Sequence, residues 1–125
     1  MEVKIMKIFD GNNVLVESNL GTIMAKWKGD RAEIGQNVQV EIDINDKFSL
    51  NKNMYIIADP TEESSIRDEK KGLLVNIIKI FDDDIIAVKL DRNEDVFLLE
   101  VENRAGLKSD MRVFIETKNL ELWTI

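Results

Sequence analysis

Apolar and polar residues alternate along most of this chain, and a period of two residues is typical of β-strands with one buried face. The clearest run is Val38 to Ile44, where every second residue is apolar, whereas the alternation of the first run breaks at Met6. Turn-forming residues such as Asp10-Gly11-Asn12-Asn13 separate the runs. We therefore predict five strands in each half of the chain. They are expected over residues 3–8, 14–16, 22–28, 38–44 and 48–58, and again over 73–81, 85–90, 96–101, 111–117 and 120–125.

The two halves resemble each other. The segment Lys7-Ile8-Phe9-Asp10 returns as Lys79-Ile80-Phe81-Asp82, at a spacing of 72 residues. Apolar positions of the fourth strand match at a spacing of 73, so that Val38 aligns with Met111. A long period that occurs only twice indicates two copies of one small domain rather than a solenoid. We infer that residues shared by both copies build the fold, and that residues found in one copy are free to serve a function.

Five short strands with tight turns predict a closed or nearly closed barrel, because closure removes strand edges that a small domain cannot otherwise protect. The predicted fold is all-β, with two tandem five-stranded small barrels of OB-like or SH3-like topology. We assign the first barrel to residues 1–58 and the second to residues 73–125. Each copy is near the lower size limit for a core that folds alone, so we expect the copies to pack on each other.

Residues 59–72 join the two copies and are strongly charged. One interpretation is a short helix, with Asp59 as N-cap, Pro60 at the first helical position and Lys70-Lys71 at the end, where cations match the helix dipole. The other interpretation is a flexible charged linker, since Ile66 is the only large apolar residue that could hold a helix against the barrels. The sequence leaves both open.

The composition excludes several classes of function. The 125 residues include no Cys and no His, which removes disulfides, thiolate zinc sites and the commonest general base and metal ligand. Seventeen Lys and Arg against 24 Asp and Glu give a net charge of −7, the opposite of what non-specific nucleic-acid binding needs. We find no catalytic motif, so we predict that the protein is not an enzyme and uses no cofactor or metal. With neither a signal peptide nor a membrane span, we expect a cytoplasmic protein.

The segment from Ala105 to Ile115, followed by Leu120-Glu121-Leu122, resembles the closing hairpin of TOBE-type OB domains. That family runs Gly-Leu-x-x-Gly-Asp-x-Val with alternating apolar residues, and Ser109 stands here at the second glycine. Residues 33–40 form a similar segment, so the resemblance covers about the last third of each copy. It implies OB-type barrels, which in that family accompany transport ATPases or bind oxyanions such as molybdate. No oxyanion-binding loop is recognisable in this chain, so the resemblance supports the fold more than the function.

One candidate surface is basic and belongs to the first copy. OB folds stack bases on aromatic residues and hold phosphates with cations, and Lys26-Trp27-Lys28 has this pattern. The candidate nucleic-acid-binding residues are Lys4, Lys7, Lys26, Trp27, Lys28 and Arg31. The repeat favours a different role for Trp27, because it aligns with Leu99 on an apolar face and is then a core residue.

A second candidate surface is apolar. Leu98 aligns with Lys26, and an apolar residue where the other copy is charged indicates a contact surface. The candidate partner-binding residues are Val96, Leu98, Trp123 and Ile125. Phe9 and Phe81, which both copies share, are expected to form core beside a turn. Asp82-Asp83-Asp84 is expected to be a solvated turn rather than a cation site.

Three functions are therefore compared. We favour a non-enzymatic protein-binding module of unknown pathway, whose partner is another protein. The first alternative is a single-stranded nucleic-acid-binding protein of OB type, which the acidic balance disfavours. The second alternative is a small-anion sensor at the junction between the copies, following the TOBE resemblance. The sequence points to no membrane partner and does not define the oligomeric state.

Overall fold

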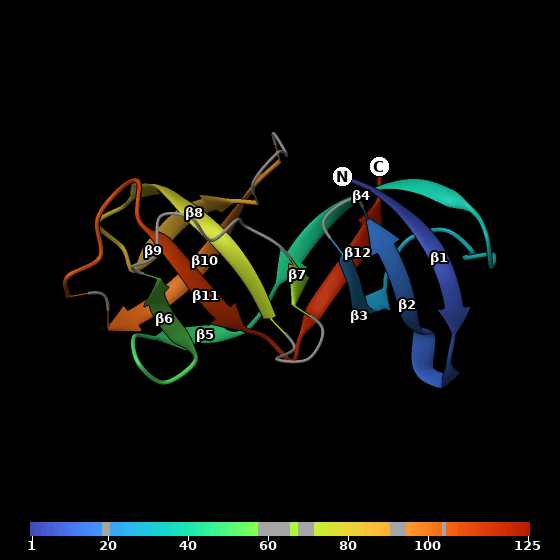
Figure 1. The fold of residues 1–125 in the computed structure, drawn as a ribbon, viewed down its shortest axis with the longest axis horizontal. Helices are drawn as coiled ribbons and strands as arrows, with labels where there is room; N and C mark the ends of the chain where they lie inside the picture. Colours follow the sequence, from blue (N-terminus) through green and yellow to red (C-terminus); the bar gives the residue numbers. More distant parts are fainter. Residues whose placement is uncertain (19–20, 58–65, 68–71, 91–94, 104) are drawn as a thin grey trace.

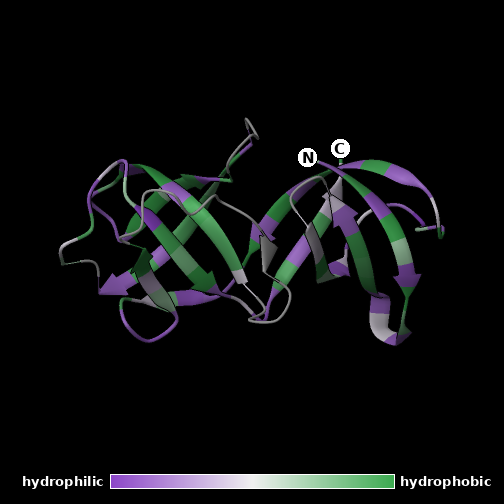
Figure 2. Cartoon of the chain, viewed as in Figure 1, coloured by the Kyte–Doolittle hydropathy of each residue, from purple (hydrophilic) through white to green (hydrophobic). Residues whose placement is uncertain are grey.

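The computed structural model describes residues 1–18, 21–57, 66–67, 72–90, 95–103 and 105–125 of the chain. These residues form two barrel-like sheets that lie side by side, with the short strand β7 (Ile66–Arg67) between them (Figure 1). Hydrophobic and hydrophilic residues alternate along most strands (Figure 2). The buried apolar side chains form one core cluster that extends through both sheets. The prediction of an all-β fold with two small barrels is confirmed.

The first sheet is a closed barrel with the strand order β1-β2-β3-β12-β4. Its strands are β1 (Glu2–Ile8), β2 (Asn13–Ser18), β3 (Gly21–Trp27), β4 (Asn37–Ile44) and β12 (Leu120–Thr124). Strands β1, β2 and β3 are successive antiparallel neighbours and β4 returns beside β1, which is the Greek-key order. Strand β12 closes the barrel, because it runs parallel to β3 and antiparallel to β4.

The second sheet is nearly closed and has the strand order β5-β10-β9-β8-β11-β6, with β7 paired to β8 off this path. Its strands are β5 (Lys47–Ser49), β6 (Met54–Ile57), β8 (Gly72–Ile80), β9 (Ile85–Lys89), β10 (Val96–Asn103) and β11 (Arg112–Glu116). Strands β8 to β11 repeat the Greek-key arrangement of β1 to β4. Strands β5 and β6 together take the place of β12, since β5 runs parallel to β10 and β6 runs antiparallel to β11.

Asn53, which precedes β6, makes hydrogen bonds to the edge strand β5 and to β11 in the second sheet. Its Oδ1 accepts a hydrogen bond from the Ser49 amide at 2.8 Å, and its Nδ2 donates to the Lys47 carbonyl at 2.9 Å. The Asn53 carbonyl accepts from the Glu116 amide at 2.9 Å, at the end of β11. The turn between β5 and β6 is thereby fixed to β5, at one end of the strand order, and to the end of β11, which is next to β6 at the other end.

The two sheets do not follow the boundaries of the sequence repeat. Strands β5 and β6, expected to complete the first copy, lie in the second sheet, and β12, expected to complete the second copy, closes the first barrel. The repeat over residues 1–58 and 73–125 therefore does not define the sheets, because each sheet takes its final strand from the other half of the chain. Only Asn45 and Asp46 separate β4 from β5, and short connections of this kind favour strand exchange.

Charged side chains favour this exchange over an arrangement in which each copy keeps its own last strand. Strand β12 places Glu121 opposite Lys26, and β5 places Lys47 opposite Glu100, with 4.0 Å between Nζ and Oε1. Without exchange, Lys47 would lie opposite Lys26. Glu121 would likewise lie opposite Glu100. Like charges that face each other destabilise a sheet, whereas opposite charges stabilise it.

Side-chain size favours the same exchange in the cores. Trp27 on β3 lies opposite Leu122 on β12, and Val101 on β10 lies opposite Phe48 on β5. All four side chains are buried. Without exchange, the largest pair, Trp27 and Phe48, would meet in one barrel, and the smallest pair would meet in the other. Overpacking and underpacking both destabilise a core, so the observed pairing distributes the volume better.

The helical interpretation of residues 59–72 is wrong for the part that the structure describes. Ile66–Arg67 form β7, which pairs antiparallel with β8, and Gly72 begins β8. Residues 59–65 and 68–71 lie outside the described residues. Within the described ranges, no helix is long and apolar enough to cross a membrane.

Strand pairing shows that the copies align at a spacing of 72 only over their first two strands. In the third strand Ile23 is equivalent to Phe97, because both lie opposite equivalent residues of the second strand, and the spacing there is 74. In the fourth strand Val38 is equivalent to Val113 rather than to Met111. Both corrections are shifts of two residues, which preserve the alternation, so the predicted buried faces are unchanged.

Candidate functional site

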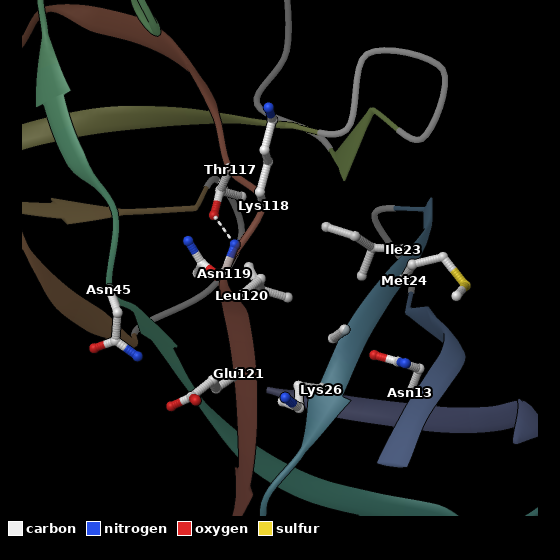
Figure 3. A pocket seen from close by; sticks show the side chains of 11 residues that line it. Asn13, Ile23, Met24, Lys26, Asn45, Thr117, Lys118, Asn119, Leu120 and Glu121 are labelled. Carbon is white, nitrogen blue, oxygen red and sulfur yellow. Dashed lines mark hydrogen bonds between the residues drawn. The ribbon is translucent and has the colours of Figure 1, made fainter. Parts of the chain in front are cut away.

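A groove opens between β3 and β12, at the point where the two halves of the chain cross (Figure 3). The ladder between these strands pairs only Lys26 with Glu121 and Trp27 with Leu122. The groove has a volume of about 570 Å³, which is in the range of pockets that hold small ligands. Its lining residues are Asn13, Ile23, Met24, Ala25, Lys26, Asn45, Thr117, Lys118, Asn119, Leu120 and Glu121.

The floor of the groove is apolar and belongs to the barrel core. Ile23 and Ala25 on β3 and Leu120 on β12 are buried, and Figure 3 shows Ile23 and Leu120 on opposite sides of the opening. Side chains at these positions alternate with outward-facing residues along each strand. A bound segment would therefore meet an apolar base that is already fixed by the fold.

The rim of the groove is polar and carries both signs of charge. Three asparagines, Asn13, Asn45 and Asn119, supply amide groups that both donate and accept hydrogen bonds. Of the residues that the structure describes, the charged ones in the rim are Lys26, Lys118 and Glu121. The rim combines residues from both halves of the chain, so the complete site exists only because of the strand exchange.

Asp46 fixes the part of the rim that precedes β12. Its Oδ1 accepts hydrogen bonds from the Thr117 hydroxyl at 2.6 Å and from the Asn119 amide at 3.3 Å. Its Oδ2 accepts from the Lys118 amide at 3.2 Å. Thr117 is buried, so its hydroxyl depends on this partner. One carboxylate from the first half thus holds three successive residues of the second half.

We expect Asp46→Ala to lower the free energy of unfolding by roughly 1–3 kcal/mol, because it leaves the buried Thr117 hydroxyl and the Lys118 amide without their acceptor. The Asn119 amide keeps the Thr117 hydroxyl oxygen as an acceptor at 3.2 Å. Chemical denaturation measures this change. Asp43→Ala, which removes an exposed carboxylate from the same region of β4, is the matched control and should change stability by less than about 0.5 kcal/mol. Equal losses for the two variants would show that Asp46 does not hold the crossing.

The structure divides the predicted nucleic-acid-binding residues. Trp27 is only 6% exposed and its Nε1 donates to the Asp30 carbonyl, so the prediction that it is a core residue is confirmed. Its equivalent in the second copy is Val101 rather than Leu99, since both lie opposite the strand received from the other half. A buried tryptophan cannot stack on a base.

The basic residues of that set do not form one continuous surface. Lys4 and Lys7 lie on β1, which β2 separates from β3, and Lys4 lies opposite Glu17. Lys28 follows β3, and its Nζ is 3.8 Å from an Oε of Glu121. Arg31 is exposed in the connection to β4. Of the six candidates, only Lys26 lines the groove.

The four predicted partner-binding residues are exposed, but they lie on two sheets. Val96 and Leu98 are on β10, and Trp123 is on β12, which Ile125 follows. Leu98 is equivalent to Met24 by strand pairing, rather than to Lys26. The interpretation that Leu98 replaces a charged residue is therefore wrong, because both copies carry an exposed apolar residue at this place.

Two further expectations concern the turns after the first strand of each copy. Phe9 is 45% exposed and Phe81 is partly buried, so the prediction that both are core residues is wrong for Phe9. Asp82, Asp83 and Asp84 are exposed, and Asp84 has a left-handed φ of 62°, as in a turn. Among the described residues, no group of three or more Asp, Glu, His or Cys side chains is placed to hold a metal ion.

Sequence reasoning missed most of the groove, because its rim forms where two connections cross. Asn45 and Asp46 appear in the sequence as ordinary turn residues, and Thr117 to Asn119 as the end of one strand and the turn before the next. One signal in the sequence could have indicated the strand exchange. Lys26 pairs with Glu121 and Glu100 pairs with Lys47, so each pair joins opposite charges from the two halves of the chain.

The fold and the groove define this chain as a protein of two small barrels that exchange strands and share a surface groove. Comparisons with protein-family models, with curated proteins and with solved structures find no match to it.

Proposed function

We propose that the protein is a non-enzymatic binding protein, and that the groove between β3 and β12 holds an extended segment of a partner protein. The observation that carries this proposal is the lining of the groove, an apolar floor beneath a rim of three asparagine amides and charges of both signs. Amide side chains donate and accept hydrogen bonds, which is what the backbone of an extended peptide requires. The absence of His and Cys from the sequence supports a binding role over catalysis.

We infer in addition that both barrels are of OB type. The OB fold is a five-stranded Greek-key barrel that binds chain-like ligands on the face of its second and third strands, between the loops that follow strands one and four. In the first barrel, Asn13 begins the second strand, residues 23–26 lie on the third, and Asn45 follows the fourth. The groove thus lies where an OB barrel would place its ligand. We also propose that the protein is cytoplasmic.

Two other ligands would use the same groove. Lys26 and Lys118 could contact the phosphates of a single-stranded nucleic acid, or a small oxyanion at the junction of the copies. Glu121 lies in the same rim and the chain carries a net charge of −7, and both features oppose an anionic ligand. Among the described residues, the groove lining also contains no aromatic side chain on which a base could stack. A peptide segment therefore fits the lining better than either anion.

Peptide selection on the full chain tests the proposal. A library of random dodecapeptides is selected on the native protein, and the affinity of a labelled selected peptide is measured by fluorescence anisotropy. The combined variant Asn45→Ala with Lys118→Glu should weaken binding by at least roughly tenfold, as truncation of central contacts does. Lys108→Glu makes the same charge change at an exposed lysine outside the groove lining, and should leave the affinity unchanged.

The anionic alternatives are tested in the same assay with oligothymidine and with molybdate. Binding of oligothymidine that falls steeply with salt and is lost in Lys118→Glu would assign the groove to nucleic acid. Binding of molybdate that is lost in the same variant would assign it to an oxyanion. Either result would overturn the peptide proposal. Selected peptides that bind the groove variants as tightly as the native chain would overturn it as well.

A further inference from the structure

Both barrels carry apolar side chains at equivalent positions on the outer face of their first three strands. We call these sets the first and second outer patch. The first outer patch contains Met6, Leu15 and Met24, beside Lys7. The second outer patch contains the equivalent residues Ile78, Ala87 and Leu98, beside Lys79. Ala87 is buried, so Ile78 and Leu98 form the exposed apolar surface of this patch.

A β-bulge in the first strand of each barrel contributes to these patches. The pairing register shifts between Ile5 and Lys7 in β1, and at the equivalent place in β8. The inserted residue is Met6 in the first barrel and Ile78 in the second, and their exposed fractions are 38% and 39%. Bulges re-aim a side chain and are over-represented next to functional sites. The break in alternation at Met6 is the sequence signature of this bulge.

The apolar residues continue across the neighbouring strands. Leu15 on β2 lies opposite Met24 on β3, and Ala87 on β9 lies opposite Leu98 on β10. Met24 and Leu98 are 44% and 58% exposed, and neither belongs to the core cluster. The barrel interior does not require an apolar residue at these places. Their recurrence in both copies therefore points to a surface with the same role twice.

Lysine lies beside each patch, although the chain as a whole is acidic. Lys7 lies opposite Leu15, and Lys79 lies opposite Ala87. The Lys79 Nζ is 5.0 Å from the centre of the Phe81 ring, which keeps this cation beside the second outer patch. An apolar surface edged by lysine is complementary to a partner segment that combines apolar residues with carboxylates.

We propose that the two outer patches are equivalent docking sites for a partner protein that presents one acidic and apolar element twice. When the first element has bound, the second binding event becomes intramolecular, so two weak contacts give a strong one. The proposal goes beyond the groove, because Met24 is the only patch residue that lines it. The two ideas can therefore fail separately.

The test uses the full chain and dodecapeptides selected from a random library, with counter-selection against the double variant Met6→Ser with Ile78→Ser. The selected peptides should be rich in Asp or Glu together with Leu, Ile or Phe. Native mass spectrometry should show two peptides bound to each chain. Met6→Ser alone or Ile78→Ser alone should leave one, and the double variant should bind none.

A tandem peptide, in which two copies are joined by a flexible linker, should bind the native chain at least roughly tenfold more tightly than the single peptide. Either single variant should abolish this gain. Ile34→Ser is the matched control, since Ile34 is 69% exposed but corresponds to Ser109 in the other copy, and it should change nothing. Thermal unfolding of each variant verifies that the barrels are intact.

One peptide per chain, or binding that neither Met6→Ser nor Ile78→Ser weakens, would overturn the proposal. Recovery of basic peptides only would overturn it as well. Loss of peptide binding in the groove variants with both outer patches intact would instead assign the selected peptides to the groove.

Discussion

Phe48→Ala is expected to lower the free energy of unfolding by roughly 3–5 kcal/mol, the usual cost of removing a fully buried phenylalanine side chain. Phe48 is 0% exposed and lies opposite Val101 in the second sheet, although it belongs to the first half of the sequence. The damage should therefore appear in the other half. Hydrogen exchange should show the largest loss of protection in β8 to β11.

The position of the loss distinguishes strand exchange from two independent copies. If each copy kept its own last strand, Phe48→Ala would expose the amides of β1 to β4 first. Val96→Ala, at a 55% exposed position of β10, is a control that should change stability by less than about 0.5 kcal/mol. Loss of protection confined to β1 to β4 would contradict the observed topology.

Leu122→Ala is the reciprocal experiment, with an expected loss of roughly 2–5 kcal/mol. Leu122 is 0% exposed on β12 and lies opposite Trp27, so the cavity would open beside this tryptophan in the first barrel. In a Trp123→Phe background, the fluorescence of Trp27 should shift to longer wavelength as water reaches the cavity. Denaturant-induced unfolding measures the loss of stability, and the Trp27 fluorescence shows whether the cavity opens in the first barrel.

The background variant is itself the control, because Trp123 is 44% exposed and its replacement by phenylalanine should leave stability nearly unchanged. A stability loss in Leu122→Ala without any change at Trp27 would place β12 elsewhere. Phe48→Ala and Leu122→Ala together should show that a substitution in one half of the sequence destabilises the barrel that the other half mainly forms.

The exchange matters for the proposed function, because it builds the groove from both halves of the chain. Lys118 and Asn119 reach the rim only because β12 enters the first barrel, and Asp46 holds them there as the chain leaves for the second sheet. Variants that loosen the crossing should therefore weaken ligand binding even when they touch no ligand. We expect Asp46→Ala to have this effect, because Asp46 holds the residues of the crossing.

The strand predicted over residues 48–58 is in fact two strands, β5 and β6, which a turn over residues 51–53 separates. The alternation of apolar and polar residues was enough to predict the other nine strands. Val38 to Ile44 shows why, since alternation over seven residues is compatible with a half-buried strand and little else. Even the misalignment of the third and fourth strands left the buried faces correct, because a shift of two residues preserves the face. The inference that shared residues are core is wrong for Phe9, which follows the end of β1 and is exposed.

By itself, the sequence determined the strand class, the duplication and the inward face of the alternating strands, since these depend on local periodicity and composition. It did not determine the inward face of β8, β9 or β11, which are buried on both faces. Only the tertiary structure decided which barrel each final strand completes, and with it the groove and the equivalence of the two outer patches. A strand pairs through backbone groups that are the same in every residue, so its own sequence specifies a face but not a neighbour. The neighbour is chosen by charge and volume across strands, as in Lys26 with Glu121 and Val101 with Phe48.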